Sequence, residues 1–390
     1  MPRRLDDLCP EPARLPKIPA QPLAPPLYTS SVYRCDDPAQ ADALLGGGLA
    51  GYVYQRDGHP NGDMLAEKFR ELHGAPRGAV AGSGMAALAA VLTAQLQAGD
   101  HMVAARQLYG RSLQLVTSEA KRFGIECTLA DVADPEAFRA ACTAKTRLML
   151  VETIANPLLR VADLAALAKI AHEAGALLVV DNTFATPYLC RPLEHGADLA
   201  FESGTKMLNG HGDAMCGLLA GAEAVWQRIP GAISCWGLAA APFDCWLTLR
   251  GISSFHLRME RACRNAQAAA EFLAGEAAVE RVDYPGLASH ADHPLAARQF
   301  GGSFGNMVAF HLRGGRAAVE AFMRAAAELP FCPSLGDVSS TLSHPASTSH
   351  RRLTEAERAA LGIHEGSLRL SVGTESPEFL ISALRQGLGG

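Results

Sequence analysis

Residues 176–206 read ALLVVDNTFATPYLCRPLEHGADLAFESGTK. Two short, continuously apolar runs, Ala176–Val180 and Leu199–Phe201, lie on either side of a less regular segment. Runs of this length without alternation are typical of strands buried on both faces of a parallel sheet. Asp181 directly follows the first run, and Lys206 comes soon after the second. Because open α/β sheets bind ligands outside the carboxyl ends of their strands, the stretch predicts both an α/β fold and the place of its site.

The residues before this stretch continue the same alternation. Arg147–Val151 is another short apolar run, and the apolar residues at 164, 167, 168 and 171 have helical spacing until Gly175. Met64–His73 is also helix-like and is followed by Gly74, a common helix-ending residue. Helices between short apolar strands predict a mostly parallel sheet with helices on both faces.

The first 27 residues are rich in proline. The pattern of apolar residues changes past residue 245. Past residue 245 we expect a long helix over 250–273, further helices over 317–327, after Thr354 and after Ser376, and strands over 307–312 and 368–372. We therefore predict an extended N-terminal arm over 1–55, a large α/β domain over 56–245 and a smaller α/β domain over 246–390.

Composition excludes several classes of protein. The 390 residues are 48% hydrophobic and carry a net charge of −5, which disfavours nucleic-acid binders and polybasic membrane binders. We find no signal peptide, no membrane span and no CxxC pair, so we expect a cytoplasmic protein with reduced thiols. The histidine pairs at 290/293 and 344/350 lack the partners of a zinc site, so we expect no metal.

A glycine-rich turn at 82–87, GSGMAA, fits the G-x-G-x-x-A pattern of dinucleotide-binding folds. It lacks a clear preceding strand, and Asp100 follows too early to be the ribose-binding acid, so we reject a nicotinamide site. Small residues that open a helix can still hold a phosphate on free N–H groups. A tight turn that only packs a helix on the sheet is the alternative.

Asp181 and the segment 202–206, ESGTK, complete a possible site. Asp181 is as well explained by the capping of a turn, and a lone lysine is more commonly a solvated surface residue. Together, however, a phosphate turn, a strand-end acid and a lysine preceded by two hydroxyls are the groups that pyridoxal phosphate requires. The hydroxyls would donate to phosphate oxygens, and a desolvated lysine amine is nucleophilic.

The motifs then extend along the chain in a fixed order and resemble the Cys/Met-metabolism family of pyridoxal-phosphate enzymes, which includes cystathionine γ-synthase, the cystathionine lyases, methionine γ-lyase and O-acetylhomoserine sulfhydrylase. The matching stretches are GSGMAA at 82–87, LYG at 108–110, ETIANP at 152–157, VDNTFATP at 180–187, SGTK at 203–206, NGHGD at 209–213, SLGD at 334–337, HPASTSH at 344–350 and RLSVGTE at 369–375. The resemblance implies the type I pyridoxal-phosphate transferase fold, similar to aspartate aminotransferase.

The resemblance also implies roles for individual residues. Lys206 would carry the cofactor and shuttle protons, Asp181 would pair with the pyridinium nitrogen, and Tyr109 would stack on the ring and assist as an acid or base. Other residues would bind the cofactor or the substrate: Gly84, Met85, Ser203 and Thr205 at the phosphate, Asn156 near the phenolic oxygen, Arg369 and Ser334 at the substrate carboxylate, and Tyr54 and Arg56 at the phosphate of an adjacent subunit.

The resemblance implies a carbon–sulfur lyase that performs γ-elimination on cystathionine-, homocysteine- or methionine-like amino acids. A γ-replacement synthase or sulfhydrylase that uses an O-acylhomoserine is the alternative, and a non-catalytic binding protein of the same fold is a third. Two substrate markers of the family are absent, because Ser339 stands where cystathionine enzymes often have Glu and Arg111 where methionine γ-lyases have Cys. We therefore expect broad specificity, and a homotetramer built as a dimer of dimers with shared sites.

Overall fold

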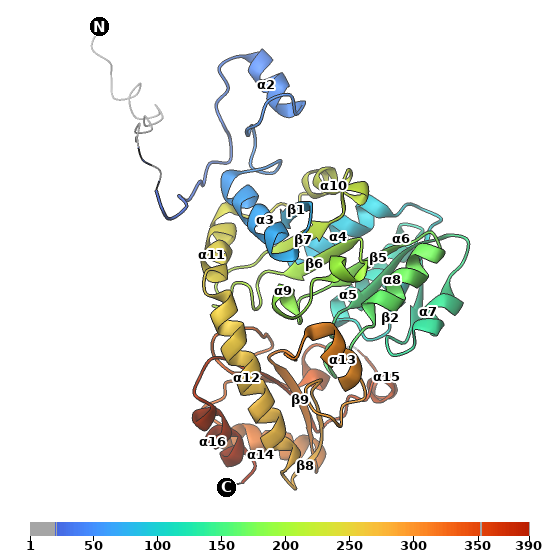
Figure 1. Cartoon of the computed structure of the whole chain (residues 1–390), viewed down its shortest axis with the longest axis vertical. Helices are drawn as coiled ribbons and strands as arrows, with labels where there is room; N and C mark the ends of the chain where they lie inside the picture. Colours follow the sequence, from blue (N-terminus) through green and yellow to red (C-terminus); the bar gives the residue numbers. More distant parts are fainter. Residues whose placement is uncertain (1–19, 21, 352, 390) are drawn as a thin grey trace.

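The computed structural model describes residues 20, 22–351 and 353–389, and most of the prolines of the predicted arm lie outside this range. Two β-sheets lie one above the other along the longest axis of the chain (Figure 1). The larger sheet has the order β1-β7-β6-β5-β4-β2-β3 and the smaller one the order β10-β11-β9-β8.

The larger sheet confirms the predicted parallel α/β architecture. Its strands are β1 Arg77–Ala81, β2 His101–Ala105, β3 Glu126–Ala130, β4 Thr146–Glu152, β5 Leu177–Asp181, β6 Leu199–Ser203 and β7 Gly217–Gly221. Strands β3, β2, β4, β5 and β6 pair in parallel, whereas β7 is antiparallel to both β6 and β1. The three strands predicted from apolar runs, β4, β5 and β6, lie side by side at its centre, so their carboxyl ends meet at one edge.

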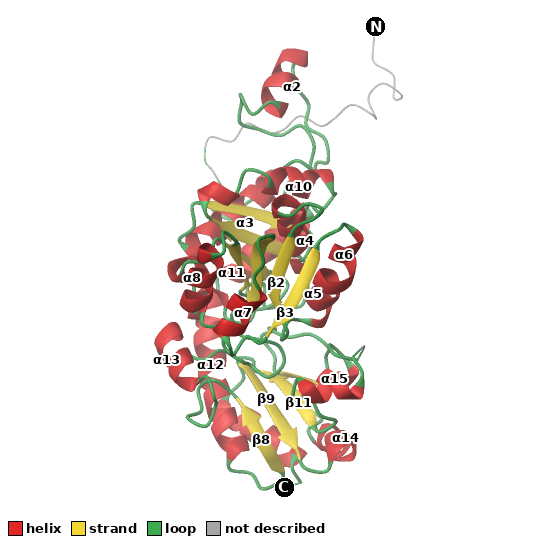
Figure 2. Cartoon of the chain, turned by 90° about the vertical axis from the view of Figure 1, so that its right-hand side faces the viewer, coloured by secondary structure: helices red, strands yellow, loops and turns green. Residues whose placement is uncertain are grey.

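Helices cover both faces of this sheet, with α7 and α8 on one side and α5 and α6 on the other (Figure 2). The helices of this part are α3 Pro60–His73, α4 Gly84–Gln95, α5 Gly110–Gln114, α6 Ala120–Arg122, α7 Pro135–Ala141, α8 Leu164–Glu173, α9 Thr186–Leu189, α10 Ile229–Cys235 and α11 Pro242–Ile252. Helix α3 starts four residues before the predicted Met64, because His59 caps it by accepting a hydrogen bond from Gly62 N at 3.0 Å. It ends at Gly74, whose φ of 61° suits glycine.

The smaller sheet is antiparallel and consists of β8 Val279–Asp283, β9 Met307–Leu312, β10 Thr341–Ser343 and β11 Ser367–Ser371. The helices around it are α12 Phe255–Ala274, α13 His293–Phe300, α14 Gly315–Ala325, α15 Glu355–Ala360 and α16 Pro377–Gly387. The predicted capping box of α15 is present, with Thr354 and Glu357 bonded to each other's backbone. The long helix expected over 250–273 is present as α12, but its predicted start is wrong, because a break at Ser253 and Ser254 separates α12 from α11.

Each sheet has its own apolar core, and α12 joins the two. The first half of α12 buries Phe255 and Met259 in the core of the larger sheet, and its second half buries Ala266 and Leu273 in that of the smaller one. The domain boundary at residue 245 stays a prediction. In the part of the chain that the structure describes, no helix combines the length and the hydrophobicity that a membrane span requires.

The described end of the N-terminal arm is mostly irregular but not wholly extended. Helix α2 spans Pro38–Leu45, because Asp37 accepts a hydrogen bond from Gln40 N and Pro38 suits the first helical position. The arm is held to the larger sheet's helices by two bonds to proline carbonyls, from Asn61 Nδ2 to Pro26 O and from Trp246 Nε1 to Pro25 O. Beyond these bonds, α2 and its flanking loops project from the body of the chain (Figure 1).

Candidate active site

A cavity of about 590 Å³ lies where the central parallel strands end, and we call it the lysine cavity. Strand β4 ends at Glu152, β5 at Asp181 and β6 at Ser203, and Glu152 is directly paired with Asp181. The smaller sheet closes the cavity with Arg369 of β11 and with Ser334 from the loop before β10. The lysine cavity therefore has walls from both halves of the molecule.

Lys206 lies in the turn that follows β6 and faces this cavity. Its Nζ donates a hydrogen bond to Ser334 Oγ at 3.0 Å. Burial, and then the positive charge of Arg369, lower the pKa of Lys206. A lowered pKa increases the fraction of neutral amine, which is the nucleophilic form.

The turn that carries Lys206 is fixed by its neighbours. Arg258 of α12 donates to the carbonyls of Met207 at 2.6 Å and Leu208 at 2.9 Å. Gly336 packs its backbone against the same turn, since a Cβ atom there would lie 2.6 Å from Met207 N. The position of Lys206 thus depends on contacts from the second half of the chain.

Asp181 is half-buried at the end of β5. The hydroxyl and the backbone N–H of Thr183 both donate to its Oδ1, at 2.5 and 2.9 Å. Burial raises the pKa of Asp181 to about 6, against the hydrogen bonds from Thr183. Its Oδ2 has no hydrogen-bond partner among the described residues. That oxygen can therefore bind a proton or accept a hydrogen bond from a cationic N–H group.

The start of α4 forms a cradle for an anion. Ser83 caps this helix by accepting a hydrogen bond from Ala86 N, and Ser83, Gly84 and Met85 line the lysine cavity with Ser203 and Thr205. A Cβ atom at Gly84 would lie 3.0 Å from Ser203 Cβ, so the close approach favours glycine. Free N–H groups at a helix start, beside two hydroxyls, suit a phosphate.

Glu152 is a site residue that sequence reasoning missed. Its two carboxylate oxygens accept hydrogen bonds from Tyr109 N at 2.5 Å and from Asn156 N at 3.0 Å. Burial, and then the negative charge of Asp181, raise the pKa of Glu152 to about 8. It follows an apolar run just as Asp181 does, and this signal could have identified it.

Arg369 is buried and reaches across the two halves of the molecule. It donates to Asn156 Oδ1 at 2.7 Å and to Ser334 O at 3.2 Å, whereas its Nε is buried without a partner among the described residues. Burial lowers the pKa of Arg369 to about 10. A buried guanidinium with an unused N–H group is a strong recognition site for a carboxylate.

Two predicted site residues are not in the lysine cavity. Tyr54 and Arg56 lie at the junction of the arm and the large domain, where Arg56 packs over the Tyr54 ring at 5.2 Å and lies 3.8 Å from Asp57. Both are exposed, and neither lines the cavity of its own chain. Ser339, considered as a substrate marker, does not line the cavity either.

The groups that line the lysine cavity fit pyridoxal phosphate. The cradle of α4 with Ser203 and Thr205 would hold the phosphate, the unpaired oxygen of Asp181 would take the ring N–H, and Lys206 would bind the aldehyde carbon. Tyr109 lines the cavity, is 39% exposed and has no side-chain hydrogen bond among the described residues, so its ring is available for stacking. When bound, this cofactor supplies an electron sink for carbanion chemistry at the substrate's α-carbon.

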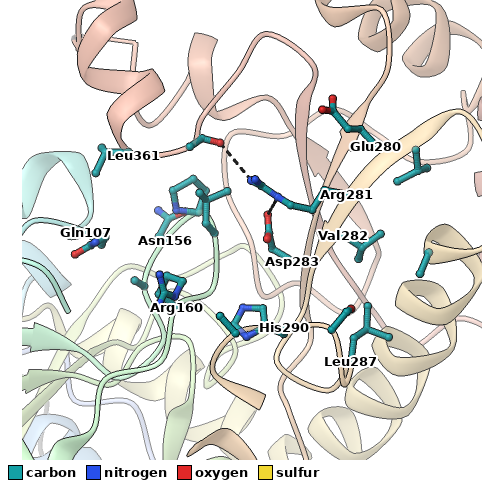
Figure 3. A pocket seen from close by; sticks show the side chains of 18 of the residues that line it. Gln107, Asn156, Arg160, Glu280, Arg281, Val282, Asp283, Leu287, His290 and Leu361 are labelled. Atoms are coloured by element: carbon teal, nitrogen blue, oxygen red, sulfur yellow. Dashed lines mark hydrogen bonds and ion pairs between the residues drawn. The ribbon is translucent and has the colours of Figure 1, made fainter. Parts of the chain in front are cut away.

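A second cavity of about 620 Å³ is also lined by Asn156, and we call it the rear cavity (Figure 3). Its arginines are paired, Arg160 with Asp292 at 2.6 Å and Arg281 with Asp283 at 3.1 Å. His290 is buried beside them, and its Nδ1 accepts a hydrogen bond from Asp292 N. The arginines of the rear cavity are therefore paired with carboxylates, whereas Lys206 and Arg369 are not paired with any carboxylate of the described residues.

Comparison with known proteins agrees with this geometry. The sequence pattern of the family described as "Cys/Met metabolism PLP-dependent enzyme" matches residues 16–389. An L-methionine gamma-lyase from Porphyromonas gingivalis is 41% identical over 94% of this chain and 92% of its own, and a cystathionine gamma-lyase from Bacillus subtilis is 37% identical over 93% of each. The crystal structure of a cystathionine gamma synthase from Xanthomonas oryzae pv. oryzae in complex with cystathionine has a TM-score of 0.88 and 41% identity, over 94% of this chain and 92% of that one.

Proposed function

Because the chain belongs to the Cys/Met metabolism family of pyridoxal-phosphate-dependent enzymes, we propose that it is a carbon–sulfur lyase that performs γ-elimination on amino acids such as methionine, homocysteine or cystathionine. In this reaction the substrate and one water give a thiol, ammonia and a 2-oxo acid. The observation that carries the proposal is Lys206, a desolvated amine in one cavity with the unpaired oxygen of Asp181 and the buried guanidinium of Arg369.

Each group has a task in such a reaction. Arg369 would bind the α-carboxylate, with Asn156 and Ser334 fixing the plane of the guanidinium. Lys206 would take the proton from the α-carbon and return a proton to the substrate, because its lowered pKa suits a general base. Glu152 would keep Tyr109 and Asn156 in place by holding their backbone N–H groups.

A product assay tests the proposal. Purified protein loaded with pyridoxal phosphate would be given methionine, homocysteine, cystathionine, cysteine and O-acetylhomoserine, each with and without sulfide. Release of a thiol and a 2-oxo acid without sulfide supports elimination. Activity that requires both an O-acylhomoserine and sulfide would contradict it and favour γ-replacement, the activity named for a relative from Pseudomonas aeruginosa, an O-succinylhomoserine sulfhydrylase.

The active unit is, in our proposal, a dimer within a cytoplasmic homotetramer. Tyr54 and Arg56 are exposed at the junction of the arm and the large domain, and among the described residues of their own chain Asp57 is the one anionic side chain near Arg56. If they complete the phosphate site of an adjacent chain, then Arg56→Ala and Lys206→Ala chains, each inactive, would regain activity when mixed. Random pairing restores at most about a quarter of the sites; no recovery in verified mixed dimers would contradict a shared site.

A further inference from the structure

Two arginines at the rim of the lysine cavity have no acidic partner in the part of the chain that the structure describes. Arg111 of α5 and Arg351 both line this cavity, and both are exposed. Arg111 donates only to the amide oxygen of Gln114, at 3.0 Å, and neither arginine forms an ion pair with any described residue. The arginines of the rear cavity, by contrast, each hold a carboxylate.

The segments that carry these arginines are packed against each other. The backbone at Gly110 touches the loop before Arg351, since a Cβ atom at Gly110 would lie 2.6 Å from Ser349 O. Ser347, Thr348 and Ser349 line the same side of the cavity. The rim is therefore a surface made of two adjoining segments, with two positive charges and several hydroxyls.

Among the described residues, no acid at the rim neutralises these charges. The acids that line the cavity are Glu152, which is buried, and Asp181, which is half-buried. Both lie at strand ends and accept hydrogen bonds, Glu152 from Tyr109 and Asn156 and Asp181 from Thr183. The α-carboxylate of a bound amino acid has its own site at Arg369, so its γ-substituent has to occupy the remaining part of the cavity. We propose that Arg111 and Arg351 recognise a carboxylate at the far end of the γ-substituent, so that the preferred substrates are amino acids whose leaving group ends in an anion.

This inference rests on the proposed function, because that function sets where the substrate lies in the cavity. The binding of unreactive substrate analogues can still test it without turnover. L-2-aminosuberate and L-2-aminooctanoate have the same chain length, differ in a terminal carboxylate and lack a γ-leaving group. Calorimetry on the cofactor-loaded enzyme should show tighter binding of aminosuberate, by roughly tenfold at low salt, since charge-assisted hydrogen bonds are strong. The preference should shrink as salt is raised, because the rim is exposed.

The variant Arg111→Gln/Arg351→Gln should abolish this preference and lower the kcat/KM ratio of O-succinylhomoserine to O-acetylhomoserine by roughly tenfold. The double lysine variant, Arg111→Lys/Arg351→Lys, retains the charges and should retain most of the preference. The control Lys145→Gln/Arg324→Gln removes two exposed charges that line neither cavity and should leave the ratio unchanged.

Equal binding of the two analogues to the wild-type enzyme would overturn the inference. So would a glutamine variant that loses affinity for pyridoxal phosphate but keeps the preference, because the arginines would then serve the cofactor phosphate. If no amino acid is turned over, the proposed function fails, and the calorimetry still decides whether the rim binds a carboxylate.

Discussion

The lysine cavity and the rear cavity have nearly equal volumes, about 590 and 620 Å³, and both border Asn156. They differ in the state of their charged groups. In the rear cavity Arg160 and Arg281 are bound to carboxylates. In the lysine cavity, among the described residues, Lys206 has only a hydroxyl partner and Arg369 keeps an unused Nε.

This difference shows that cavity size does not identify the active site. A buried polar group without a partner costs free energy, and Arg369 Nε is such a group in a residue that lines a cavity where a ligand can bind. The perturbed pKa values of Lys206, Asp181 and Glu152 point to the same cavity. The predictions below change one group at a time and ask whether the two cavities respond as differently as their chemistry implies.

The largest effect is expected for Lys206→Ala. Loss of the amine removes both the covalent attachment point and the proton shuttle, so kcat should fall by at least about 10³-fold. Cofactor binding should survive in a weaker, non-covalent form, because the phosphate cradle and Asp181 are unchanged. Steady-state kinetics and equilibrium dialysis measure the two effects, with Lys145→Ala as an exposed-lysine control that should behave as wild type.

A smaller loss is expected for Arg369→Lys. Lysine keeps the charge but cannot bond to Asn156 Oδ1, Ser334 O and a carboxylate at the same time. Losing a charge-assisted hydrogen bond should lower kcat/KM by roughly ten- to a hundredfold. Unchanged kinetic constants would show that the substrate carboxylate binds elsewhere.

Glu152→Gln should lower kcat/KM by about tenfold, because an amide NH₂ group would face one of the two backbone donors and leave it unpaired. The variant should also change the pH dependence of stability in cofactor-free protein. With a pKa raised to about 8, Glu152 binds a proton in the folded state that the unfolded state releases near its ordinary pKa. Stability contributed by this group is therefore present at low pH and is lost as the pH rises through about 8.

Chemical denaturation between pH 5 and pH 8 tests whether folding stability falls as the pH rises. The free energy of unfolding of the wild type should fall more steeply with pH than that of Glu152→Gln, by up to about 1.4 kcal/mol per pH unit. Parallel curves would mean that Glu152 is ionised in the folded state over this range.

The smallest effect is expected in the rear cavity, for Arg281→Gln. Its pair with Asp283 is partly exposed, so the change should cost no more than about 1 kcal/mol of stability. We expect kcat/KM to change less than about twofold. A loss of activity as large as that of Arg369→Lys, in protein of normal stability, would remove the distinction between the two cavities.

Much of the fold could be predicted from apolar runs. The expected strand over 307–312 coincides with β9, and the runs before Glu152 and Asp181 became β4 and β5, because fully buried strands need continuous apolar sequence. The break between α11 and α12 was not predictable, since Ile252 and Phe255 keep helical spacing across it. The antiparallel direction of β7 was also not predictable, because an apolar run does not show whether a strand is parallel or antiparallel to its neighbours.

The site was partly predictable from the order of motifs along the chain, rather than from apolar runs. Motif order identified Lys206, Asp181 and Arg369, and strand-end position explains why the first two meet. Local sequence could not show that Lys206 bonds to Ser334, 128 residues away, nor that Glu152 holds Tyr109 and Asn156 together. These contacts depend on how the two halves of the chain pack, which no single motif encodes.

The most direct test of the account is to locate the cofactor on the chain. Wild-type protein loaded with pyridoxal phosphate would be reduced with borohydride, digested and mapped by mass spectrometry. The account predicts a stable covalent adduct at Lys206, and no adduct in the Lys206→Ala variant at equal cofactor occupancy. An adduct at another lysine, with Lys206 unmodified, would contradict the assignment of the lysine cavity as the active site.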